Sequence, residues 1–187
     1  MCNAGIIQTF LLINFSNIQV KMERKELDKR FLQASVKGNL QDVKNLLEQG
    51  ANIEAKDSKG NTALNIATYF EHVEVIKHLI EKGANIHTKN NFGWTPLHYA
   101  ARFGNMELVK DLVEKGANIH AKDDGGWTPL HWAAAYSHPK IVRFLIEKGA
   151  DASLKTNSGA TPLDLAYSND EIKDILKKAI KSKKEVF

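Results

Sequence analysis

The chain has 187 residues, of which 43% are hydrophobic and 26% are charged, so it is long enough and apolar enough to bury a sizeable core. The sequence contains no run of about 18 uninterrupted apolar residues, the length typical of a membrane-spanning helix. Cys2 is the single cysteine, which excludes an intrachain disulfide and a zinc cluster built from cysteines.

The net charge of +4 resides at the C-terminal end of the chain. Positions 173–187 hold six lysines and two acidic residues, whereas positions 1–172 hold equal numbers of basic and acidic side chains. A DNA-binding surface needs an excess of basic side chains to neutralise phosphates. We therefore expect no contact with nucleic acid by the body of the chain.

Residues 1–21 form an unpatterned extension. Residues 1–20 carry no charge, and Gln8 and Thr9 interrupt their apolar run. A signal peptide has a basic first segment and a cleavage site of small residues, and neither is evident here. Three interpretations stay open: a misassigned start or disordered extension, a segment that packs on the first repeat or on a partner, and a weak export signal.

From residue 22 onward the sequence repeats at a constant interval. Closely similar sequences follow four evenly spaced glycines: Gly50, Gly83, Gly116 and Gly149. A threonine comes at the same distance after each of these glycines. The interval predicts a five-unit array with these bounds: an N-terminal cap at 22–49, complete repeats at 50–82, 83–115 and 116–148, a C-terminal cap at 149–182 and a tail at 183–187.

Within each repeat the residues predict two short helices. In the repeat 83–115, Thr95 suits the N-cap of the first helix and Pro96 its first turn, while Gly104 can end it in the left-handed conformation. Apolar residues at spacings of three and four then mark one face of a second helix from Met106 onward. A helix pair this short is marginal alone, so we expect the stacked array to be the folding unit.

The motif Thr-Pro-Leu-His begins at Thr95 and again at Thr128. Together with a repeat length of about 33 residues, this motif resembles the ankyrin repeat family. The resemblance covers about residues 25–180. It implies an all-α solenoid of stacked helix-turn-helix units with short β-hairpin-like turns. It also implies a non-catalytic module for protein–protein interaction, whose hairpin tips and first-helix ends line a concave groove that contacts the partner.

The positions that vary between repeats are the candidate contacts with a partner protein. They are rich in aromatic residues, which with arginine are the side chains most enriched in binding hot spots. We expect these rings to face solvent until a partner covers them; the alternative is that some rings pack on neighbouring hairpins and merely fill the groove. The candidates are Ser58, Lys59, Asn61, Tyr69, Phe70, Asn91, Phe92, Trp94, Arg102, Phe103, Asp124, Trp127 and Tyr136. Tyr99 and Trp132, inside the first helices, are interpreted as core or half-core residues.

Nothing in the sequence favours catalysis, a metal or a cofactor. His98 and His131 lie one repeat apart, and zinc needs three or four convergent ligands. Asp123 and Asp124 are neighbours in a turn, where they are more typical of turn formation than of acid–base chemistry. The glycine-rich and nucleophile motifs of nucleotide-binding proteins and hydrolases are absent from the sequence.

We therefore expect a monomeric adaptor in the cytoplasm that binds another protein, with no cofactor. An alternative is a secreted or membrane-associated effector of an intracellular bacterium, in which the array engages host proteins. The uncharged N-terminus and the lysine-rich tail would then provide membrane contact or targeting. A third alternative is nucleic-acid binding through the tail.

Overall fold

The computed structural model describes residues 4–167 and 169–184 of the chain. Within these residues the backbone forms ten helices, with these bounds: α1 (Ala4–Lys37), α2 (Leu40–Glu48), α3 (Ala63–Tyr69), α4 (Val73–Glu81), α5 (Pro96–Phe103), α6 (Met106–Glu114), α7 (Pro129–Ala135), α8 (Pro139–Glu147), α9 (Pro162–Leu165) and α10 (Asp170–Lys184).

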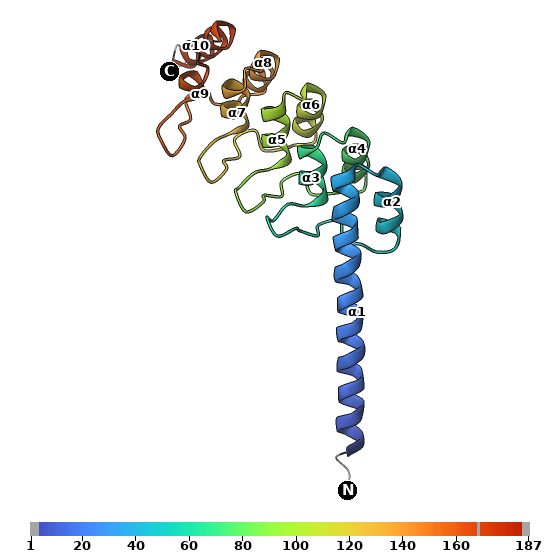
Figure 1. Cartoon of the computed structure of the whole chain (residues 1–187). Helices are drawn as coiled ribbons and strands as arrows, with labels where there is room; N and C mark the ends of the chain where they lie inside the picture. The colour runs from blue at the N-terminus through green and yellow to red at the C-terminus, as the bar shows by residue number, and fades with distance from the viewer. Residues whose placement is uncertain (1–3, 168, 185–187) are drawn as a thin grey trace.

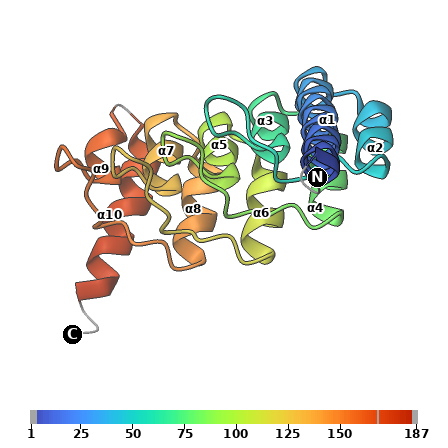
Figure 2. The same ribbon diagram turned by 90° about the horizontal axis from the view of Figure 1, so that it is seen from below.

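The helices form a solenoid of stacked pairs (Figure 1). The inner helices α3, α5, α7 and α9 pack side by side, and each also packs on the outer helix that follows it in the chain. The loops that precede the inner helices project together on one side of the array (Figure 1), and Figure 2 shows the outer helices as a second row. The expected all-α solenoid is therefore confirmed.

The residues that begin and end the helices do so as the sequence predicts. Thr95 is the N-cap of α5, and its backbone N–H donates to Nδ1 of His98 at 3.0 Å. Pro96 occupies the first turn, where a backbone donor has no partner within the helix. Gly104 ends α5 in the left-handed conformation, with φ of 80°.

The core lies between the inner and outer helices. Leu97 of α5 is 1% exposed, and Val109 and Leu112 of α6 are fully buried, which confirms the predicted apolar face of the second helix. Ala100 and Ala101 are buried as well, so small side chains let neighbouring inner helices approach closely. Each repeat thus buries one apolar face against the next, and the array is stabilised as a whole.

Helix α1 is longer than the cap helix expected from the sequence. Its C-terminal half serves as the first inner helix: it packs on α2 and α3, Phe31 is fully buried and Ala34 is buried. Its N-terminal half extends beyond the repeats in Figure 1. The backbone is therefore continuous through the predicted boundary between the extension 1–21 and the cap 22–49. No helix in the described part of the chain, α1 included, has an apolar stretch long enough to cross a bilayer.

The C-terminal cap is a short inner helix, α9, followed by the longer helix α10. Ile172 and Leu176 face the array and are fully buried, whereas Lys177 and Lys181 are exposed on the outer side. The predicted tail at 183–187 begins inside α10, which continues to Lys184, and residues 185–187 lie outside the described residues.

Candidate functional site

A hollow of about 640 Å³ lies where the first two hairpin loops meet the ends of α3 and α5. Seven of the thirteen candidate residues line it: Lys59, Asn61, Tyr69, Phe70, Phe92, Trp94 and Arg102. Ser58 lines a separate hollow beside α1. The other candidates are not among the residues of this hollow: Asn91, Phe103, Asp124, Trp127 and Tyr136.

The aromatic candidates differ in how far they reach solvent. Tyr69 and Phe70 are each 47% exposed, Phe92 is 58% exposed and Tyr136 is 45% exposed. The other three rings are half-buried: Trp94, Phe103 and Trp127. Asn61 and Arg102 are half-buried as well. Ser58, Lys59, Asn91 and Asp124 are exposed at the tips of the loops.

The expectation that Trp94 and Trp127 face solvent needs correction. Both are half-buried because both pack on Trp132 of α7, with ring centroids 4.4 Å away in each case. Trp132 is itself half-buried, as interpreted from the sequence, and its Nε1 donates to Asp123 Oδ2 at 3.1 Å. The three indoles form a continuous layer across two repeats, so Trp132 belongs to the site although it was not among the candidates.

Tyr69 is the centre of a second aromatic group. Its ring meets the rings of Phe70, Tyr99 and Phe103 edge to face, with centroids 4.9, 5.8 and 5.6 Å away. Tyr99 is 7% exposed, and burial, with the charge of Asp57 as a smaller cause, raises its pKa to about 12. Edge-to-face contacts of this kind hold rings in defined orientations.

The floor of the hollow is a network of neutral polar groups. Asn90 Nδ2 donates to the Tyr99 hydroxyl at 2.8 Å and to Asn61 Oδ1 at 2.9 Å. The Tyr99 hydroxyl donates in turn to Asn61 Oδ1 at 3.3 Å. Asn61 was a candidate for partner contact, and its carbonyl oxygen is already engaged within the chain.

Arg102 lies among four rings. Its guanidinium carbon is 5.5 Å from the Trp94 ring and 5.2 Å from the Phe103 ring, which belong to its own repeat. It is also 5.7 Å from Trp132 and 5.0 Å from Tyr136, which belong to the next repeat. These four rings are called the aromatic box below.

The loop tips are tied to one another by backbone hydrogen bonds. Asn91 N donates to Lys59 O at 2.9 Å, Asp124 N to Phe92 O at 3.1 Å and Asn157 N to Gly125 O at 2.9 Å. The side chain of Asn91 adds a bond to Ser58 O at 3.2 Å. The rim of the groove is therefore a connected structure rather than a set of separate loops.

The two motif histidines have structural hydrogen bonds. His98 Nε2 lies 3.0 Å from Ala121 O and 3.1 Å from Trp127 O, and His131 Nε2 lies 3.1 Å from Leu154 O. Burial lowers the pKa of His98 to about 4 and also lowers that of His131. In the described part of the chain, no three His, Cys, Asp or Glu side chains converge as metal ligands would.

The family model described as ankyrin repeats (3 copies) matches residues 31–123 and residues 107–185. No curated protein matches the sequence well enough to be counted as a relative. The two matched regions span well over half of the chain and agree with the helix pairs, the projecting loops and the repeated Thr–His cap. The chain belongs to the ankyrin repeat family.

Proposed function

We propose that this chain is a non-catalytic adaptor module that binds another protein in its concave groove. Ankyrin repeats are generally protein–protein interaction modules, and most of this chain consists of them. The observation that carries the proposal is the group of exposed rings that line the hollow, Tyr69, Phe70 and Phe92. Exposed aromatic rings gathered on one face are typical of a surface that a partner covers.

The surroundings of the rings explain how such a surface binds. The edge-to-face contacts of Tyr69 and the bonds between loop tips hold the groove in one shape before a partner arrives. Little conformational entropy is then lost on binding. Each ring that the partner covers contributes roughly 25 cal/mol for every Å² of apolar surface removed from water.

Affinity capture from the cells that make the protein tests this proposal. We expect the double variant Phe70→Ala, Phe92→Ala to lose the captured partner, while far-UV circular dichroism and the melting temperature change little because both residues are about half exposed and neither belongs to the core. Tyr167→Ala is a matched control, since Tyr167 is also an exposed ring but lies in the C-terminal cap. Equal capture by the double variant and the unaltered chain would reject the groove assignment.

A further inference from the structure

Arg102 is a charged residue of the groove whose side chain is surrounded by aromatic rings. It sits in the aromatic box, and its Nε is buried without a hydrogen-bond partner. Within the described residues, none of the four ion pairs includes it. Its positive charge is thus held in place by rings, which attract a cation through their faces but accept no conventional hydrogen bond from it.

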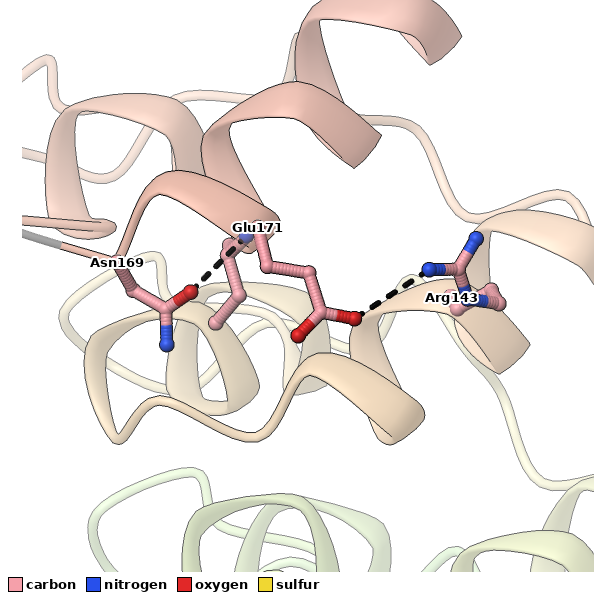
Figure 3. A network of polar contacts seen from close by, with 4 residues as sticks. Arg143, Asn169 and Glu171 are labelled. Atoms are coloured by element: carbon pink, nitrogen blue, oxygen red, sulfur yellow. Dashed lines mark hydrogen bonds and ion pairs between the residues drawn. The ribbon is translucent and has the colours of Figure 1, made fainter.

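Arg143 shows how an arginine elsewhere in the same array is neutralised. On the outer helix α8, its Nη2 lies 3.4 Å from Oε1 of Glu171, which belongs to α10, the outer helix of the C-terminal cap (Figure 3). This pair joins two neighbouring repeats on the outer side. The guanidinium of Arg102 joins two repeats through rings instead, and no carboxylate of the described chain pairs with it.

Two carboxylates of the groove, those of Asp57 and Asp123, are already engaged by other donors. Asp57 lines the same hollow, and it accepts from the backbone N–H groups of Lys59 and Asn61, each at 2.8 Å. Asp123 accepts from the backbone N–H of Trp127 at 2.8 Å, in addition to its bond with the indole of Trp132. Both acids shape their own loop tips, so Arg102 keeps unused donors toward the groove.

We infer that the groove binds an acidic segment of its partner protein, with an Asp or Glu carboxylate of the partner on Arg102 and an apolar side chain against Phe92. This inference rests on the proposed function and names the chemistry of the ligand. A guanidinium presents its donors as a fork that matches a carboxylate, and charge-assisted bonds of this kind are stronger than neutral ones. Lys59, exposed on the same hollow, supplies a second positive charge.

The aromatic box makes Arg102 suited to this role. A free arginine side chain loses rotational freedom when it binds, but this one is already held between rings of two repeats.

Nucleic acid is the less favoured ligand, because phosphate backbones need a row of cations and positions 1–172 hold equal numbers of basic and acidic side chains.

The test begins with a library of short random peptides, selected on the immobilised full chain. We expect the selected peptides to share an Asp or Glu beside an apolar residue. For the tightest peptide, Kd is then measured by fluorescence anisotropy, together with a copy in which the shared acid is replaced by its amide. Loss of a charge-assisted bond predicts that Arg102→Gln and the amide copy each weaken binding about tenfold or more.

The losses in binding free energy caused by Arg102→Gln and by the amide copy should not be additive, because both changes remove the same interaction. Arg102→Gln is therefore expected to bind the acidic peptide and its amide copy equally, and Arg102→Lys to recover part of the preference. A purely structural role of Arg102 would not produce this preference for the acid. Arg143→Gln is the control, since it removes one arginine from the outer face, and it should leave both dissociation constants unchanged.

The outcomes separate this inference from the proposed function. Selected peptides without a shared acid, or an Arg102→Gln variant that still prefers the acidic peptide, would overturn the acidic ligand. If those peptides nevertheless do not bind the Phe70→Ala, Phe92→Ala variant, the proposal that the groove binds a partner is supported and only the acidic ligand is rejected. If single-stranded DNA binds in place of any peptide and is lost in Arg102→Gln, the inference is overturned in favour of phosphate.

Discussion

Nε2 of His138 lies 2.8 Å from the backbone oxygen of Arg102, so the residue before the outer helix α8 reaches the end of α5, the inner helix of the preceding repeat. His72 makes the same contact two repeats earlier, with its Nε2 2.9 Å from Val36 O. At the equivalent position between them, Asn105 caps its own helix instead, with its Oδ1 accepting from Leu108 N at 3.0 Å. Histidine contacts between repeats thus alternate with asparagine caps along the array.

The position of the His138 ring against the end of α5 predicts that Gly104→Ala destabilises the array. A Cβ at this glycine would lie 2.6 Å from Cε1 of His138, and the backbone has a φ of 80°, which L side chains rarely adopt. We expect the free energy of unfolding to fall by at least about 1–2 kcal/mol, measured by urea denaturation. The double change Gly104→Ala, His138→Asn should recover the part due to the clash, and a Gly104→Ala protein as stable as the original would contradict this account.

Glu71→Gly is expected to have the opposite effect. Glu71 occupies the position equivalent to Gly104 one repeat earlier, and its φ of 58° is also in the left-handed region. Its side chain is exposed, so removing it costs little packing. We expect stability to rise by about 1 kcal/mol, seen as a higher melting temperature. A lower melting temperature would show that the Glu71 side chain contributes contacts that outweigh its backbone strain.

The repeats could be predicted from the sequence because the same helix cap and the same apolar spacing recur along the array. The helix cap recurs at a fixed offset, and the structure places Thr62, Thr95, Thr128 and Thr161 in that role. The left-handed residue that ends the inner helix recurs as a conformation, but only Gly104 and Gly38 are glycines there, while Glu71 and Ser137 stand in two other repeats. The extent of α1 could not be predicted in this way. Residues 1–20 have neither charges nor repeated text, so no periodic pattern indicates where a helix that ends at Lys37 begins.

The hollow was predicted in part, because variable positions at loop tips and helix ends do surround it. What the pattern could not show was the direction of each ring. Trp132 occupies the position equivalent to Tyr99 one repeat later, and both follow a motif histidine, yet only Trp132 lies between two other indoles. The aromatic box of Arg102 combines rings from two repeats, and a comparison of repeats one by one does not bring such residues together.

Trp132 should therefore contribute to stability more than the exposed rings do. Trp132→Ala removes its contacts with Trp94 and Trp127 and leaves one oxygen of Asp123 without its indole donor. We expect a loss of about 3 kcal/mol in the free energy of unfolding, at the lower end of the range for aromatic-to-alanine changes because the ring is only half-buried. Phe92→Ala is the control and should change stability by less than about 0.5 kcal/mol. Equal losses in the two variants would argue against the indole layer.

Acid should destabilise the array through His98. Burial lowers the pKa of His98 from 6.5 to about 4 in the folded chain, so the unfolded chain binds the proton first as the pH falls. Its contribution is therefore fully present above pH 6.5 and is lost progressively between pH 6.5 and about 4. The shift corresponds to a loss of about 3 kcal/mol, which urea denaturation at pH values across this window measures.

His98→Asn is the variant that isolates this effect, because the first complete repeat already uses asparagine at the same place. There Asn65 Oδ1 accepts from the Thr62 backbone N–H at 3.2 Å and from the Thr62 hydroxyl at 2.8 Å, so the helix cap survives without a titratable ring. We expect the variant to be less stable at neutral pH, since its shorter side chain gives up the carbonyl contacts of Nε2. Its stability should nevertheless fall less steeply with acid than that of the unaltered chain. If the two proteins lose stability in parallel from pH 6.5 to about 4, His98 does not carry the acid sensitivity.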